Sequence, residues 1–100
     1  VAFNSSDERQ KSNIQVIDSP MSKLYEIKGV TFNWNDNCSI MYNTGKSDVG
    51  VIAQDVEKVL PDAVKEREDG FKGVDYNKLV PLLVEAVKEL SDRVKELEAK

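Results

Sequence analysis

The sequence predicts an α+β fold in which a small globular part of short strands and helices precedes a long C-terminal helix. Residues 30–34 alternate between apolar and polar side chains, as a half-buried strand does. A Ser-Pro pair at 19–20 is a typical helix start, and apolar residues recur with heptad spacing from Val80 onward. With 100 residues the chain is the size of one domain with a modest core, so we expect it to oligomerise.

Composition excludes several classes of site. The chain has no histidine, which rules out Ser-His-Asp and Cys-His catalysis and the HExxH zinc site. Cys38 is the only cysteine, so no intrachain disulfide can form and no oxidising compartment is required. No metal-ligand cluster or phosphate-binding glycine loop occurs, so we expect no metal and no cofactor, although a nucleotide or ion held between subunits would leave little trace.

Charge and hydropathy argue against two kinds of partner. Fourteen basic and eighteen acidic residues give a net charge of -4, which disfavours nucleic acid and anionic membranes. No apolar run approaches the ~20 residues that span a bilayer. The first residues, Val1 to Asn4, have neither the features of a signal peptide nor an initiator Met, so we expect a C-terminal piece of a longer protein.

The first third of the chain predicts a surface segment, a helix and a strand. Residues 5–13 are polar without apolar periodicity, and Ile14, Val16 and Ile17 supply the first apolar anchor. Ser19 should cap a short helix with Pro20 in its first turn, and Gly29 should stop it. Residues 30–34 should form a strand with Val30, Phe32 and Trp34 on one face.

The middle of the chain predicts a loop, a strand, a helix and a hairpin. We expect a loop over 35–48, with an uncertain strand at 39–42 and a turn at 43–45. Residues 49–53 are a compact apolar run suited to a buried strand, which leads into a helix over 54–60 that Pro61 ends. Residues 63–66 and 71–74 should pair as a hairpin, with Gly70 taking the positive φ. Gln54, Asp55 and Glu57 should lie on the surface of the short helix rather than in a site.

The last helix should begin at an Asp75 cap, and Pro81 should either kink it or mark its true start. Its first half is broadly apolar and should pack on the globular part, whereas its second half should project. The heptad pattern places Val80, Val87 and Val94 at a and Leu83, Leu90 and Leu97 at d.

This stripe has two interpretations: the core face of a domain helix, or a seam for self-association. The strict spacing and the polar residues after Glu89 favour self-association. In a parallel assembly Arg93 could reach Glu98 of a neighbouring chain, and Glu89-Arg93 and Glu96-Lys100 have i,i+4 spacing. Val at a with Leu at d is typical of two strands, but three heptads decide the number of chains poorly.

The candidate nucleophile and base lie within Ser6 to Lys11. Without histidine, a serine hydroxyl needs lysine or a carboxylate as its base. Lys11 is five residues from Ser6, a spacing that separates them by about 140° on a helix and places them on opposite faces of a strand. A turn must bring them together, or Lys11 must come from another subunit. Lys11 must also lose its proton, which burial or a nearby cation such as Arg9 favours. From this spacing alone, a solvated loop is the favoured interpretation.

Four stretches together resemble the peptidase S74 family, the self-cleaving intramolecular chaperone domain at the C-terminus of phage tailspikes, tail fibres and neck appendages. They are SDERQKSNI at 6–14, GVTFNW at 29–34, GVIAQDV at 50–56 and VDYNKLVPLL at 74–83. No one of them is decisive, but their order and spacing over nearly the whole chain are specific.

The resemblance implies that three copies assemble through a parallel trimeric coiled coil, help an upstream fibre to fold, and cut themselves off. Ser6 would be the nucleophile and Lys11 the general base of a Ser-Lys dyad, with Asp7 and Arg9 as possible supporting residues. Cleavage would fall between Ser5 and Ser6. Residues 1–5 would end the fibre, and residues 6–100 would be the chaperone, with a globular part at 6–75 and a coiled-coil helix at 76–100.

The implied partners are two further copies of this chain and the upstream fibre or spike segment. The implied location is the host cytoplasm during virion assembly, with release from the mature virion. Two alternatives stay open. One is a noncatalytic trimerisation module, and the other is the equivalent self-cleaving domain of a eukaryotic membrane-tethered transcription factor, which short length and the lack of a following membrane span disfavour.

Overall fold

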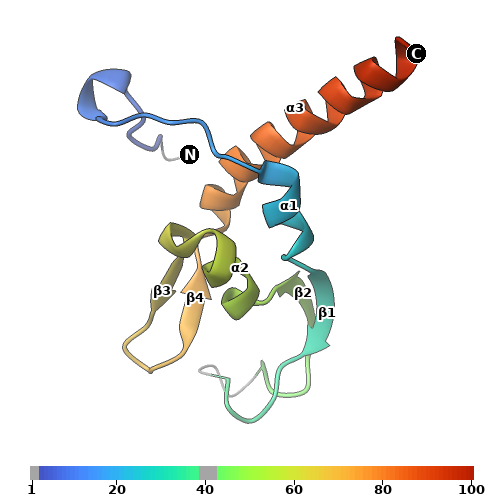
Figure 1. The fold of residues 1–100 in the computed structure, drawn as a ribbon. Helices are drawn as coiled ribbons and strands as arrows, with labels where there is room; N and C mark the ends of the chain where they lie inside the picture. Colours follow the sequence, from blue (N-terminus) through green and yellow to red (C-terminus); the bar gives the residue numbers. More distant parts are fainter. Residues whose placement is uncertain (1–2, 39–42) are drawn as a thin grey trace.

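The computed structural model describes residues 3–38 and 43–100, and it confirms the α+β prediction. Its described part holds two antiparallel two-stranded sheets, short helices and a long C-terminal helix (Figure 1). The uncertain strand expected at 39–42 lies outside the described residues. The two sheets and the helices packed on them form a folded body at one end of the molecule. The N-terminal arm, residues 3–16, and the end of the last helix extend from this body.

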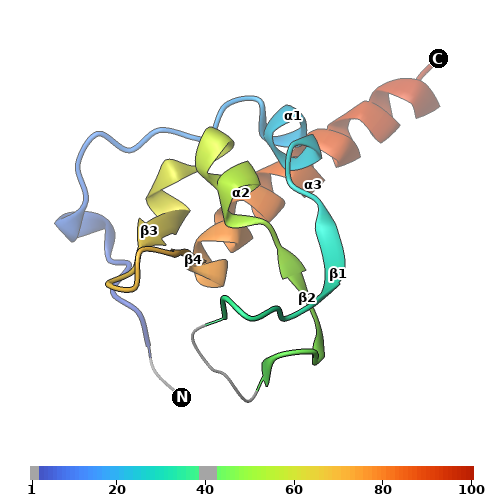
Figure 2. The ribbon, with the colours of Figure 1, turned by 90° about the horizontal axis from the view of Figure 1, so that it is seen from below.

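The core of the body forms around α2 (Ala53–Val59), which lies between the two sheets (Figure 2). Its Val56 is fully buried, and Ala63, in the 3-10 turn η3 (Pro61–Ala63), is 2% exposed. The expected helix over 54–60, ended by Pro61, is therefore confirmed to within one residue. Lys72 of the hairpin donates to Glu57 of α2 and joins these two elements through an ion pair.

The first sheet pairs β1 (Gly29–Asn33) with β2 (Ser47–Val51), in the register Gly29 opposite Val51. Phe32 and Trp34 meet edge to face at 5.0 Å on the half-buried face, as the alternation predicted. The expectation of a buried strand at 49–53 is wrong in two respects. The strand starts and ends two residues earlier than expected. Val49 is 70% exposed, because among the described strands β2 pairs with β1 alone.

The first helix, α1 (Pro20–Tyr25), has its proline in the first turn as predicted, but both of its ends differ from the expectation. Ser19 has left-handed backbone angles (φ 46°, ψ 50°), and its hydroxyl makes no capping hydrogen bond. The helix ends at Tyr25 rather than at Gly29, through tight turns at Glu26 and Ile27. Gly29 instead opens β1.

The second sheet is the predicted hairpin of β3 (Val64–Glu66) and β4 (Lys72–Val74). Gly70 adopts φ +86° in its turn, the left-handed conformation that glycine tolerates best. The Arg67 N–H donates to the Phe71 carbonyl at 2.8 Å and closes the turn. The Asp75 N–H then donates to the Ala63 carbonyl, which returns the chain to the start of the hairpin.

The last helix, α3 (Leu79–Glu98), follows a short 3-10 turn, η4 (Tyr76–Lys78). Asp75 caps that turn rather than α3 itself, because its carboxylate accepts from the Asn77 N–H at 3.1 Å. α3 begins two residues before Pro81. Pro81 therefore lies in the first turn, where its missing N–H costs no hydrogen bond.

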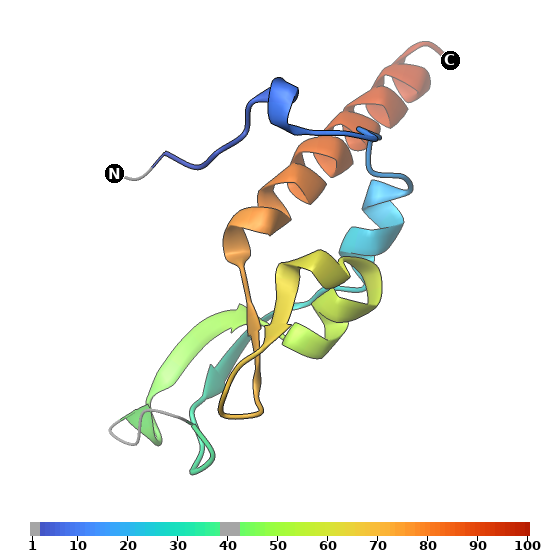
Figure 3. The same cartoon turned by 90° about the vertical axis from the view of Figure 1, so that its left-hand side faces the viewer.

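The two halves of α3 lie in different environments. Leu82 and Ala86 are 0% and 3% exposed where the first half packs beside α1, as expected. Every residue from 90 to 100 is exposed, and the second half projects beyond the other elements (Figures 1 and 3). Within the part of the chain that the structure describes, the C-terminal half of the helix is thus left exposed to solvent.

Candidate functional site

The N-terminal arm extends away from the body, and all its described residues from 3 to 16 are exposed (Figure 3). Its only regular element in the described part is the 3-10 turn η1 (Glu8–Gln10). The Gln10 N–H donates to the Asp7 carbonyl at 3.0 Å, and the Lys11 N–H donates to the Glu8 carbonyl at 3.1 Å. Two successive backbone bonds therefore reverse the chain between Ser6 and Lys11.

The turn brings the predicted nucleophile and base together. Lys11 Nζ donates to Ser6 Oγ at 2.8 Å, within one chain. Neither a helix nor a strand makes this contact at five-residue spacing, and the turn required by the sequence argument is the one observed. An amine at hydrogen-bond distance from a hydroxyl is the arrangement that lets lysine take the serine proton.

The two possible supporting residues pair with each other. Arg9 Nε donates to Asp7 Oδ1 at 3.1 Å, and Arg9 Nη2 donates to Asp7 Oδ2 at 2.9 Å. The Arg9 backbone N–H also donates to Asp7 Oδ1, at 2.9 Å, which makes Asp7 the N-cap of η1. The Arg9 guanidinium and then its backbone N–H lower the pKa of Asp7 below its ordinary 3.8, and the carboxylate raises the pKa of Arg9.

The heptad residues form a second candidate site, the seam. We define the seam as the a and d residues of α3, whose side chains are between 45% and 66% exposed: Val80, Leu83, Val87, Leu90, Val94 and Leu97. Arg93 donates to Glu89 at 2.8 Å within the helix, as the i,i+4 spacing predicted. An apolar stripe this exposed is unusual for a helix that serves only its own domain.

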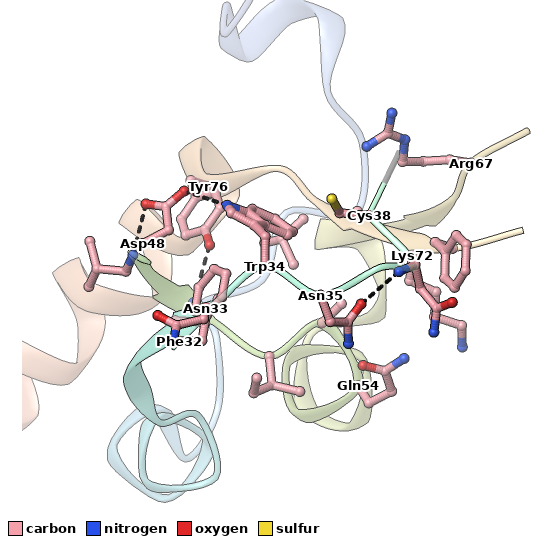
Figure 4. Close-up of a pocket in the computed structure, with 18 residues that line it drawn as sticks. Phe32, Asn33, Trp34, Asn35, Cys38, Asp48, Gln54, Arg67, Lys72 and Tyr76 are labelled. Atoms are coloured by element: carbon pink, nitrogen blue, oxygen red, sulfur yellow. Dashed lines mark hydrogen bonds between the residues drawn. The ribbon is translucent and has the colours of Figure 1, made fainter. Parts of the chain in front are cut away.

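Sequence reasoning missed an open hollow between the first sheet, α2 and the hairpin (Figure 4). Trp34 lies in it and donates to Asp48 at 3.2 Å. Tyr76 Oη accepts from the Val51 N–H at 3.1 Å, and a Cβ on Gly50 would lie only 2.6 Å from that oxygen. The lining residues are far apart in the sequence and share no motif, so no pattern along the chain could have indicated the hollow.

The part of the chain that the structure describes lacks two other kinds of feature. Over residues 3–38 and 43–100, no three His, Cys, Asp or Glu side chains are grouped so that they could hold a metal ion. Within the same ranges, no helix has the length and apolar character to cross a membrane.

Known proteins similar to this chain are phage fibre proteins. The long tail fiber protein Gp37 of Enterobacteria phage K3 is 41% identical over 95% of this chain, and that of Enterobacteria phage T2 is equally similar. The Gp37 of Salmonella phage S16 is 35% identical over 93% of this chain. The chain spans only 8%, 7% and 13% of these relatives.

A family comparison covers the arm and most of the body. The model of the peptidase S74 family, described as chaperone of endosialidase, matches residues 6–65. The match begins at Ser6 and includes the turn, both sheet 1 strands, α2 and the start of the hairpin. The chain therefore belongs to the peptidase S74, or chaperone of endosialidase, family.

Proposed function

We propose that residues 6–100 form a trimerising intramolecular chaperone that assists folding of an upstream phage tail fibre and then cuts itself from it between Ser5 and Ser6. The observation that carries the proposal is the 2.8 Å contact between Lys11 Nζ and Ser6 Oγ. The family match and the tail-fibre relatives support the chaperone part. Chaperone action would take place in the host cytoplasm during assembly, and residues 6–100 would be absent from the mature virion.

The cleavage step needs only groups that lie on the arm, and water. Neutral Lys11 Nζ takes the Ser6 hydroxyl proton while Oγ attacks the Ser5 carbonyl carbon through a five-membered ring. The bond from that carbon to the Ser6 nitrogen breaks, and Lys11 returns the proton to the departing amine. Water then hydrolyses the ester, which releases the Ser5 carboxylate and restores the Ser6 hydroxyl.

Assembly would control this step by removing water from around Lys11, rather than by bringing Lys11 to Ser6. Within one chain Lys11 already reaches Ser6, but both lie on an exposed arm and the lysine acts as hydrogen-bond donor. Removing water from an ammonium favours its neutral form, which can accept a proton. If neighbouring copies cover the arm, cleavage reports completed assembly; cleavage by a monomer would contradict this coupling.

The seam is the proposed contact between copies. Its exposed a and d residues fit a parallel coiled coil, and the number three follows from the family resemblance. In the trimer Arg93 could exchange its intrachain partner Glu89 for Glu98 of the neighbour. The chaperone role would then depend on the helices and the cleavage role on the arm.

The test uses a fibre-length precursor and compares native sequence with Ser6→Ala and Lys11→Ala. Intact mass and N-terminal sequencing should show a fragment that begins at Ser6 from the native chain, and no cut in either variant. Ser5→Ala and Ser12→Ala are matched controls, since they remove hydroxyls of the same arm that do not contact Lys11 in the structure. Both controls should still be cut, and a loss of cleavage in Ser5→Ala alone would move the assigned nucleophile by one residue.

The second candidate is a noncatalytic assembly module, which the exposure of Ser6 and Lys11 favours. In that case the native chain and all four variants would trimerise and stay whole. The eukaryotic transcription-factor alternative receives no support from the relatives, whose names are those of phage tail fibre proteins.

A further inference from the structure

Lys11 makes a contact that its charged neighbours would not lead one to expect. Two carboxylates, Asp7 and Glu8, lie within four residues of it, yet its ammonium donates to the neutral hydroxyl of Ser6. A carboxylate is ordinarily the stronger partner for an ammonium, because the attraction of opposite charges adds to the hydrogen bond. Of these two carboxylates, that of Asp7 has both of its oxygens engaged by another residue of the arm.

Arg9 is the residue that occupies the Asp7 carboxylate. Its backbone N–H and Nε both donate to Oδ1, and its Nη2 donates to Oδ2, so both oxygens have a partner. The fork of the guanidinium matches a carboxylate, whereas a lysine ammonium offers only a point charge. Over the described residues, the side-chain hydrogen bonds of Asp7, Arg9 and Lys11 all lie within residues 6–11. Glu8 is the remaining charged residue of that segment.

We infer, on the basis of the proposed function, that Asp7 and Arg9 are positioning residues for self-cleavage with two separable roles. Asp7 caps the turn that carries Lys11 onto Ser6. Arg9 holds the Asp7 carboxylate so that it cannot pair with Lys11 and keep it protonated. The two side chains thus set both the geometry and the charge around the base, without touching the reacting atoms.

The two roles predict pH shifts of opposite sign. Arg9→Gln frees the carboxylate to stabilise the protonated lysine, so the pH at which cleavage reaches half its maximal rate should rise. Asp7→Asn keeps a capping side chain but removes the negative charge beside Arg9, so that pH should fall. Each shift should be about half a pH unit, because the groups are exposed to water.

Loss of the cap has a different signature. Asp7→Ala removes both the cap and the charge, and a typical cap corresponds to about a fivefold change in the population of the turn. The maximal cleavage rate should therefore fall about fivefold in Asp7→Ala but stay near native in Asp7→Asn. A merely structural role for Asp7 would lower the rate without the pH shift in Asp7→Asn.

The experiment follows cleavage of the fibre-length precursor, unfolded in denaturant and diluted into buffers from pH 6 to 10. Intact mass gives the cut fraction over time, and trimer yield of Ser6→Ala at each pH corrects for refolding. Asp18→Asn is the matched control, since it breaks an ion pair of the same length, 2.9 Å between Asp18 and Lys23, on another part of the chain. The control should leave the pH profile unchanged.

Shifts in opposite directions for Arg9→Gln and Asp7→Asn, with the control unmoved, would support the inference. A native precursor that cleaves with the same pH profile as both variants, or variants that shift together, would overturn it while leaving the proposed function intact. A native precursor that never cleaves would overturn the proposed function, and this inference with it.

Discussion

The arm and the body of this chain are built by different kinds of interaction. The arm, residues 3–16, is exposed throughout, and its turn is held by hydrogen bonds that span at most five residues. The body depends on long-range burial, with Val56 of α2 and Leu82 of α3 fully excluded from water. Local bonds can therefore hold reactive groups in place while the hydrophobic core is assembled elsewhere.

The arm and the core should therefore affect different properties of the chain. Exposed hydrogen bonds and ion pairs contribute little to stability, whereas buried apolar side chains contribute most of it. Changes in the arm should thus alter the proposed cleavage and leave the body folded, and changes in the core should unfold the body and leave the turn formed. Four experiments test this separation.

The largest effect is expected from Leu82→Ala, which leaves a cavity in the core where a fully buried side chain of α3 is truncated. The free energy of unfolding should fall by about 2–5 kcal/mol, a large share of the ~5–15 kcal/mol typical of a domain. Urea denaturation of the dilute chain measures it. Leu83→Ala is the control, because the neighbouring side chain is 45% exposed and should change stability far less. Equal losses in the two variants would contradict the assigned core.

A smaller effect, on assembly rather than on folding, is expected from Leu90→Ser in the seam. Burying a leucine between copies contributes about 1.5–3 kcal/mol, so self-association in sedimentation should weaken by tenfold or more. The helical circular dichroism of the body should persist. Lys88→Ser makes the same residue on another face of α3 and should leave association unchanged. If the seam plays no part in assembly, Leu90→Ser and Lys88→Ser will self-associate equally in sedimentation.

Gly50→Ala tests the contact between the first sheet and the 3-10 turn η4. The added methyl would meet Tyr76 Oη at 2.6 Å, and such overpacking costs about 1–3 kcal/mol. Tyr76→Phe removes that oxygen, so the double variant should lose less stability in thermal denaturation than the sum of the single variants. Gly29→Ala, which meets nothing within 4 Å, is the control. Strict additivity would show that the close approach has no energetic effect.

The smallest effect is the pH dependence of the arm. Because Arg9 lowers the pKa of Asp7, the pair stabilises the turn fully above the ordinary value of 3.8 and is lost as pH falls through the lowered folded value. An NMR titration should find the Asp7 carboxyl protonating below 3.8, while signals from the body stay folded. Arg9→Gln should return Asp7 to its ordinary range. An ordinary titration in the native chain would contradict the pairing.

Much of the fold followed from local patterns. The Pro20 helix start, the alternation around Phe32 and the glycine of the hairpin turn were predicted because each depends on neighbouring residues alone. The errors fall where neighbours in space decide. Residues 49–51 look buried by composition, but with a single partner strand Val49 stays exposed. Helix α1 ends at Tyr25, four residues before the Gly29 that was expected to stop it.

The candidate site divides in the same way. The need for a turn between Ser6 and Lys11 could be argued from spacing, but the pairing of Arg9 with Asp7 could not, since several charged partners were equally near in the sequence. Aspartate two residues before an arginine was the available signal for the cap. Tyr76 and the hollow around Trp34 gave none, because their partners lie on other elements.

The sequence alone indicated the candidate nucleophile and base, the turn that must join them, the heptad spacing of α3 and the family, because all of these are properties of short or regularly spaced segments. The packing of the chain was needed to show which half of α3 is buried, why residue 50 has no side chain, and that residues 3–16 are exposed. Burial is shared among segments far apart in the chain, and it exists only once they have packed.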